Sequence, residues 1–163
     1  MSKKSHVSET PATHFLKAEG VAFGEHIYDY VEHGGTTESA AQLGVDEHAV
    51  VKTLVMQDEH AHPLMVLMHG DRQVSLKNLA RAMSLKSITP CTPEVAHRHS
   101  GYMLGGTSPF GTRKPIPIVL ESTVLELPLI YINGGRRGFL VSMPPSELVR
   151  LLKPTIVTVG LPH

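Results

Sequence analysis

Two aliphatic runs, Val50–Met56 and Leu64–Met68, place the strongest constraint on how this chain can fold. Both runs are short and rich in β-branched and aliphatic side chains, a composition that favours strands. The polar segment between them, DEHAHP, is long enough to form a connecting loop. The sequence therefore predicts a hairpin at this point, with both of its strands buried.

Short helices are predicted on both sides of the hairpin, because capping residues, prolines and glycines punctuate the chain there. These helices are expected to begin at Thr10, at Thr36 or Thr37, at Ser75, at Thr92 and near Pro145. An extended segment is expected at 21–31, a brief turn at Asp46, and further strands at 116–121, 129–133, 139–143 and 155–159. The GGRRG segment is expected to join two of these strands as a tight hairpin.

The predicted strands outnumber the helices, and the helices interrupt them at irregular intervals. This order favours an α+β fold, with a curved, mixed and partly barrel-like β-sheet surrounded by short helices, over a doubly wound parallel sheet. The chain has 163 residues, of which 41% are hydrophobic. A chain of that size can bury roughly two-thirds of its unfolded surface in one core. We therefore expect a single domain over residues 1–163.

The composition also indicates the cellular compartment and excludes two uses of cysteine. No apolar run follows the N-terminal lysines, and no stretch approaches the roughly 20 apolar residues needed to cross a membrane. We therefore expect a cytoplasmic protein without a membrane partner. Cys91 is the single cysteine, which excludes a disulfide within the chain and a site of four thiolates for zinc.

The net charge of zero conceals a strong difference between segments of the chain. Residues 1–69 contain four basic and ten acidic side chains, whereas residues 70–114 contain seven basic and two acidic ones. A local basic segment suits one anionic partner, whereas DNA-binding domains are usually basic overall. The same charges are also compatible with ordinary solvated helix faces. Lys77 and Arg81 are expected to lie together on the outer side of one helix, four residues apart.

Glycine is concentrated in GYMLGGTSPFG, residues 101–111, which contains four glycines in eleven positions. Such glycines allow a positive φ and let a ligand approach backbone N–H groups, which can bind an anion or an oxyanion. A purely structural loop also fits this composition. The spacing matches neither the phosphate-binding loop nor the dinucleotide-binding motif, so nucleotide triphosphate chemistry is disfavoured.

Lys52 interrupts the otherwise apolar run VVKTLVM. An unpaired ammonium is costly to bury, so its side chain should face a cleft, or reach solvent from the edge of a strand. We consider it the leading candidate for a charged functional group.

Other catalytic arrangements find little support. The chain has eleven histidines, but His60-x-His62 and His97-x-His99 lie in polar segments and no H-E-x-x-H motif occurs. No metal and no other cofactor is therefore expected. Ser108 precedes a proline and lacks the setting of a hydrolase nucleophile, and Cys91 has no evident histidine partner.

Four segments together resemble the YbaK/EbsC proteins, relatives of the editing domain of bacterial prolyl-tRNA synthetases. These segments are VVKTLV at 50–55, DRQVSLKNLA at 71–80, GYMLGGTSPFG at 101–111 and INGGRRG at 132–138. The resemblance spans nearly the whole chain in order. It implies one α+β domain that hydrolyses the ester of mischarged aminoacyl-tRNA in trans, with Cys-tRNA(Pro) as the first substrate to consider.

The resemblance also implies roles for particular residues. Lys52 would be the essential lysine, and Gly105 would offer backbone contacts to the ester carbonyl. The pocket tyrosine would be Tyr28, which follows His26 in a similar H-x-Y. The substrate is expected to touch further residues of the glycine motif and of the basic segments, namely Gly106, Thr107, Ser108, Lys77, Arg136 and Arg137.

One position departs from the pattern of the better-known YbaK/EbsC proteins. Those proteins have an acidic residue shortly after the GGKRG turn, whereas Leu140 stands at that place here. This change leaves alanine and other small residues open as alternatives to cysteine. A non-catalytic module that binds tRNA or a synthetase remains the alternative from another class. In the deacylase interpretation tRNA is the partner, prolyl-tRNA synthetase a further one, and substrate groups supply the nucleophile.

Overall fold

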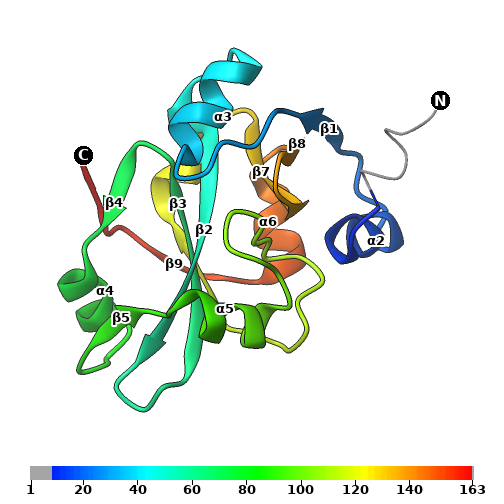
Figure 1. Ribbon diagram of the computed structural model, residues 1–163. Coiled ribbons are helices and arrows are strands. Elements are labelled where there is room, and N and C mark those ends of the chain that lie inside the picture. Colours follow the sequence, from blue (N-terminus) through cyan, green and yellow to red (C-terminus); the bar gives the residue numbers. More distant parts are fainter. Residues whose placement is uncertain (1–8, 163) are drawn as a thin grey trace.

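The structure is a computed structural model that describes residues 9–162 (Figure 1). Residues 1–8 and 163, which the single-domain prediction includes, lie outside the described residues. The α-helices are α2 (Pro11–Ala18), α3 (Gly35–Leu43), α4 (Leu76–Ala82), α5 (Pro93–Ser100) and α6 (Ser146–Leu152). Two short 3-10 helices are η1 (Glu47–Ala49) and η2 (Ser122–Glu126). None of the helices between residues 9 and 162 is both long and apolar enough to cross a bilayer.

Strands provide the scaffold of the molecule. They are β1 (Gly24–Ile27), β2 (Val50–Asp58), β3 (Pro63–His69), β4 (Arg72–Val74), β5 (Ile88–Pro90), β6 (Ile118–Glu121), β7 (Ile130–Arg136), β8 (Phe139–Met143), β9 (Thr155–Val157) and β10 (Gly160–Pro162). The main sheet has the order β1-β8-β7-β2-β3-β6-β9, with β5 also paired to β2. A separate pair joins β10 to β4. The main sheet contains both parallel and antiparallel pairs, so the predicted α+β fold with a mixed sheet is confirmed.

The predicted hairpin forms from β2 and β3, which pair antiparallel from Val51 opposite His69 to Gln57 opposite Pro63. Successive side chains of a strand point to opposite faces, and on β3 they enter two different core clusters. Met65 and Leu67 belong to one cluster, whereas Val66 and Met68 belong to the other. β3 is therefore buried on both faces, as predicted. The prediction does not hold for the middle of β2, where the side chains from Lys52 to Leu54 are only half-buried.

Capping explains most of the helix boundaries. Thr10, Ser75 and Thr92 each accept a hydrogen bond from a backbone N–H of the first turn, as predicted. The predicted cap of α3 at Thr36 or Thr37 is wrong, because the N-cap is Gly34. The two threonine hydroxyls instead donate to Glu47 Oε2, at 2.8 and 2.9 Å. This pair of bonds ties α3 to η1 beside the start of β2.

Candidate active site

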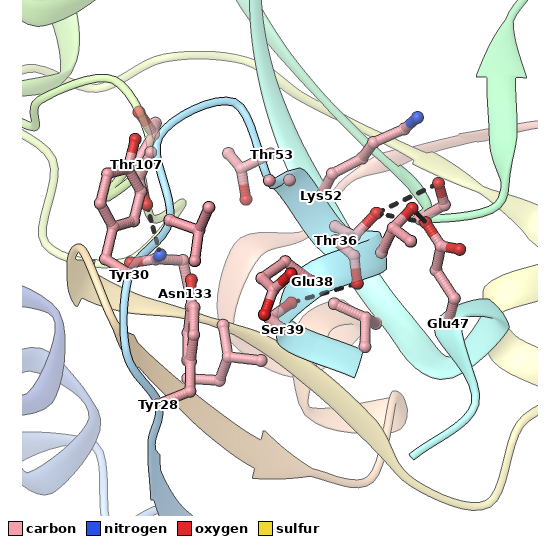
Figure 2. Close-up of a pocket in the computed structure, with 18 of the residues that line it drawn as sticks. Tyr28, Tyr30, Thr36, Glu38, Ser39, Glu47, Lys52, Thr53, Thr107 and Asn133 are labelled. Carbon is pink, nitrogen blue, oxygen red and sulfur yellow. Dashed lines mark hydrogen bonds between the residues drawn. The ribbon is translucent and has the colours of Figure 1, made fainter. Parts of the chain in front are cut away.

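A gap in the sheet creates the site. β2 runs parallel to β7 only at Val50 opposite Tyr131 and Val51 opposite Ile132. β5 joins β2 further along, at Met56 to Asp58. Between these two pairings no strand of the described chain accompanies that edge of β2. A cavity of about 470 Å³ opens there, lined among others by Tyr28, Glu38, Lys52, Gly105, Asn133 and Leu140 (Figure 2). We refer to it as the Lys52 cavity.

Lys52 is the cation of this cavity. Partial burial lowers the pKa of its ammonium from the ordinary value, and the carboxylates of Glu47 and Asp71 oppose that shift. Glu47 lies in the wall of the cavity and is fixed by the two threonine hydroxyls of α3. An ammonium held in partial burial, without a direct ion pair among the described residues, is available to an anionic ligand.

The glycine segment 101–111 forms the opposite wall. Gly101 ends α5 with φ +85°, and Gly105 also has a positive φ, +86°. The Gly106 N–H donates to Met103 O at 2.8 Å, which excludes it from binding a ligand. The Gly105 N–H has no acceptor within residues 9–162. The amide of Gly105 is therefore a free donor of this loop at the cavity.

The β7–β8 hairpin holds the glycine segment in place. Asn133 Nδ2 donates to Gly105 O at 3.1 Å, and Asn133 Oδ1 accepts from the backbone N–H groups of Gly135 and Arg136. Arg137 Nε donates to Leu104 O at 2.8 Å. The Arg137 guanidinium also lies over the ring of Tyr30, 4.8 Å from its centroid. Asn133 and Arg137 thus fix the loop that presents the Gly105 amide.

The expected substrate-binding residues divide into two groups. Tyr28 and Thr107 line the Lys52 cavity, as does Leu140, which stands in place of the acidic residue of the better-known relatives. Burial raises the pKa of the Tyr28 hydroxyl, which keeps that group a neutral hydrogen-bond donor. Ser108 does not reach the cavity, because it is fully buried and its hydroxyl accepts from Phe110 N. The remaining expected residues lie outside the cavity walls, namely Gly106, Lys77, Arg136 and Arg137.

A second cavity, of about 440 Å³, continues from the first along the same free edge of β2. The two cavities share the walls formed by Lys52, Thr53, Leu104 and Thr107. The rest of the second cavity is mainly apolar, with walls from Leu54, Met56, Val74, Pro90, Cys91 and Ala96. The Thr53 hydroxyl in the shared wall is buried and has no hydrogen-bond partner within the described residues. A buried hydroxyl left unpaired costs about 1–3 kcal/mol, so a ligand group that paired with it would gain affinity.

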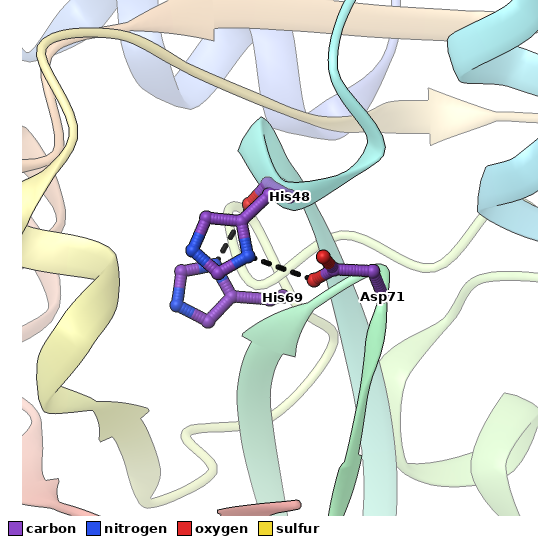
Figure 3. Close-up of side chains that lie close together, drawn as sticks. All are labelled: His48, His69 and Asp71. Carbon is purple, nitrogen blue, oxygen red and sulfur yellow. Dashed lines mark hydrogen bonds and ion pairs between the residues drawn. The ribbon is translucent and has the colours of Figure 1, made fainter. Parts of the chain in front are cut away.

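Three side chains that could in principle hold a metal ion meet where η1 contacts the end of β3. Ligand atoms of His48, His69 and Asp71 lie within 4.8 Å of one another (Figure 3). However, His48 Nδ1 bonds to Asp71 Oδ1 at 2.8 Å, and His69 Nδ1 donates to His48 O at 2.7 Å. The other ring nitrogen of His69 bonds to Thr123 Oγ1, and the two imidazoles stack 3.7 Å apart. Parallel stacked rings cannot both direct lone pairs at one ion, so we interpret the cluster as a support for η1.

Sequence reasoning missed several residues of the Lys52 cavity, including Tyr30, Thr36, Glu38 and Asn133. Asn133 precedes a predicted glycine turn, which is a position where asparagine often bonds to the backbone. That signal was available in the sequence. The other three come from segments whose contact with β2 depends on how the chain folds back.

Comparisons with known proteins place the chain in a family. A family model described as the aminoacyl-tRNA editing domain matches residues 32–151, which include Lys52, the glycine segment and Leu140. The EbsC protein of Enterococcus faecalis, to which Cys-tRNA(Pro)/Cys-tRNA(Cys) deacylase activity is ascribed, is 27% identical over 93% of this chain and 93% of its own length.

A curated relative and a solved structure give two further comparisons. A proline–tRNA ligase of Streptococcus equi subsp. zooepidemicus is 28% identical over 63% of this chain, and the match spans 16% of the ligase. A solved structure of a protein assigned as a trans-editing enzyme for prolyl-tRNA synthetase shares the fold, with a TM-score of 0.80 and 22% identity over 91% of this chain and 94% of that one. The predicted resemblance is thereby confirmed. The chain belongs to the aminoacyl-tRNA editing domain family.

Proposed function

We propose that this protein is a hydrolase that cleaves, in trans, the ester between a wrongly attached amino acid and the 3′ end of tRNA. The observation that carries the proposal is the meeting of a lysine ammonium and an unpaired glycine amide in one cavity, at the gap between β2 and β7. Hydrolysis of an ester places negative charge on the carbonyl oxygen in the transition state. Preorganised donors aimed at that charge are among the largest contributions to catalysis.

The two groups have different roles in this proposal. The Lys52 ammonium binds a phosphate of the tRNA end or the aminoacyl group, and holds the ester in a fixed position. The Gly105 N–H donates a hydrogen bond to the carbonyl oxygen as its charge develops. Removing one such donor from an enzyme typically lowers kcat by about two to three orders of magnitude.

The nucleophile is proposed to come from the substrate and not from a protein triad. Ser108 is buried, and Cys91 lies in the second cavity, where burial raises the pKa of its thiol and so disfavours the thiolate. A neighbouring ribose hydroxyl or the thiol of a cysteinyl substrate would supply the reacting group, and water would complete the hydrolysis. The enzyme then contributes positioning and electrostatic stabilisation.

The cavity walls suggest the class of amino acid. Leu140 is almost fully buried and gives one wall an apolar, uncharged surface. Small neutral side chains fit such a wall, so we propose cysteine first, because of the activity ascribed to EbsC, and alanine next. The second cavity would receive the terminal nucleotide of tRNA, which we propose as the partner. A complex with prolyl-tRNA synthetase is a further proposal.

The decisive experiment is deacylation of a panel of aminoacyl-tRNAs by the purified protein, with the Lys52→Ala variant in parallel. We expect hydrolysis of cysteinyl- or alanyl-tRNA(Pro), little hydrolysis of prolyl-tRNA(Pro), and loss of activity in Lys52→Ala. A protein that binds tRNA but hydrolyses no member of the panel would be a binding module. Full activity in a folded Lys52→Ala variant would contradict the proposed mechanism.

A further inference from the structure

The Lys52 cavity has two carboxylates in its walls, Glu38 and Glu47. Glu47 is already engaged, because it accepts from both threonine hydroxyls of α3 and faces the charge of Lys52. Glu38 differs in both respects. It forms no ion pair within residues 9–162, and it is not among the charges that act on Lys52.

Glu38 is nevertheless held in a defined position. Its Oε2 accepts from Gln42 Nε2 at 2.7 Å. Gln42 is itself clamped to the backbone of Asp29, because its Nε2 donates to Asp29 O and its Oε1 accepts from Asp29 N, both at 2.8 Å. Every polar group of the Gln42 amide is thus used. Glu38 Oε1 has no hydrogen-bond partner within the described residues, so the carboxylate is fixed by a neutral group and its charge is not compensated.

Besides Glu47, which the two threonine hydroxyls engage, the cavity therefore contains the Lys52 ammonium and the uncompensated Glu38 carboxylate. In Figure 2, Glu38 lies on α3 beside Ser39, with Tyr28 on one side of it and Lys52 on the other. A complementary ligand would present an anionic or polarised oxygen to Lys52 and a cation to Glu38. The ester of an unblocked α-amino acid has this pattern, because its ammonium is attached to the carbon next to the reacting carbonyl.

We propose that Glu38 binds the α-ammonium of the aminoacyl group, and so restricts this protein to esters of amino acids with a free α-amino group. The inference rests on the proposed deacylase function and adds a specificity determinant to it. The carboxylate would also orient the ester carbonyl toward the Gly105 amide, because the ammonium and the carbonyl are attached to adjacent carbon atoms. The apolar wall at Leu140 remains for the amino-acid side chain.

The test compares two substrates of nearly equal size, alanyl-tRNA(Pro) and lactyl-tRNA(Pro), in which a hydroxyl replaces the ammonium. Because the ammonium also activates the ester chemically, each kcat/KM is divided by the uncatalysed rate of hydrolysis of the same ester. The variant is Glu38→Gln, whose amide oxygen can still accept from Gln42. The matched control is Glu32→Gln, since Glu32 is an exposed carboxylate on the preceding loop and lies outside the cavity.

We expect Glu38→Gln to lower the normalised kcat/KM for alanyl-tRNA by about tenfold to a hundredfold, the range for one charge-assisted hydrogen bond. Its activity on lactyl-tRNA should stay within about twofold of the wild type, and Glu32→Gln should change neither substrate. The melting temperature of each variant reports whether the fold is intact.

The outcomes separate the two proposals. An equal loss on both substrates, or no loss on either, overturns the role of Glu38 and leaves the deacylase proposal standing. If the wild-type protein hydrolyses no aminoacyl ester of the panel, the deacylase proposal itself fails, and the specificity role of Glu38 fails with it.

Discussion

At the scale of single residues, Lys52 is a charged group that partial burial destabilises and that the proposed function requires. The pKa of its ammonium is lowered because the group loses hydration in the cavity. The carboxylates of Glu47 and Asp71 act in the opposite direction and raise that pKa in part. A lysine that binds its proton less tightly in the folded chain lowers the free energy of unfolding while it is charged. This loss of unfolding free energy is complete at pH values below the pKa of the lysine in the folded state. It becomes smaller as the pH rises above that value, and it is absent above the pKa of the lysine in the unfolded state.

The first prediction follows from that balance. Lys52→Met keeps the aliphatic part of the side chain and removes the charge, so at pH 7 we expect an unfolding free energy equal to or above that of the wild type. Lys52→Arg should retain charge but lose most deacylation, because a planar guanidinium does not replace a compact ammonium at a fixed distance. Urea denaturation and single-turnover deacylation measure the two effects. A large loss of stability in Lys52→Met would instead assign the lysine a structural role.

The second prediction concerns Gly105. Its φ of +86° strains any other residue, and an added Cβ would lie 2.8 Å from Tyr30 Oη. Gly20 is the matched control, because its φ is +73° and an added Cβ would meet nothing within 4 Å. We expect Gly20→Ala to cost about 1 kcal/mol of unfolding free energy without affecting catalysis. Gly105→Ala should cost more and lower kcat/KM at least tenfold, since the Tyr30 ring or the loop must move. Equal effects of the two substitutions would argue against this account.

At the scale of elements, the β7–β8 hairpin has two roles. It pairs within the sheet, and its turn fixes the glycine segment through Asn133 and Arg137. The register of this pairing changes between Asn133 and Arg136. The irregularity begins at Asn133, whose side-chain amide bonds to Gly105 O of the glycine segment. The position of the Gly105 amide therefore depends on the position of the hairpin in the sheet.

The third prediction separates the two arginines of that turn. Arg137→Ala removes the hydrogen bond to Leu104 O and the contact with Tyr30, so the glycine segment should become more mobile. We expect faster limited proteolysis within 101–111, a kcat/KM reduced about tenfold, and a melting temperature lower by a few °C, since exposed contacts of this kind contribute about 1 kcal/mol. Arg136→Ala should leave proteolysis unchanged, because Arg136 is exposed and its side chain forms no hydrogen bond or ion pair with the loop among the described residues. The same proteolysis pattern in both variants would contradict this division.

At the scale of the whole molecule, the basic segment 70–114 borders the second cavity. The residue that opens α4, Leu76, lies in the wall of that cavity, and Lys77 and Arg81 are exposed on the same helix. A tRNA end that enters along the free edge of β2 would pass close to this helix. If the proposed function holds, this basic segment is the side of the molecule that would face the tRNA.

The fourth prediction tests this proposed tRNA-facing side by measuring how tRNA affinity depends on salt concentration. Phosphate contacts release counterions, so the affinity for tRNA should fall as salt concentration rises. Lys77→Glu and Arg81→Glu should each weaken binding at low salt and flatten the slope of log Kd against log salt by roughly one unit. Lys17→Glu, an exposed charge reversal on α2, is the control and should change the slope much less. Binding that ignores salt, or that responds equally to all three reversals, would refute this orientation.

The sequence by itself determined the local elements of this protein. Caps such as Ser75 and Thr92 act within one turn of helix, and the hairpin of β2 and β3 follows from two adjacent apolar runs, so neighbouring residues suffice to specify them. Of the three-residue strands, β9 lies within a predicted strand, whereas β4, β5 and β10 were not predicted. A strand of three residues is too short to show a clear periodicity, and it forms only through pairing with its partner.

The site was decided by tertiary structure. Lys52 was identifiable as a charge in an apolar run, but the cavity beside it exists because β7 separates from β2 after two residue pairs, a property of contacts some 80 residues apart in sequence. The same long-range packing buries Ser108, which shared the glycine motif, and brings Glu38 of α3 into the cavity. A local pattern specifies which side chains are unusual. Which of them face one another depends on strand pairing, because loop closure over such distances leaves no trace in neighbouring residues.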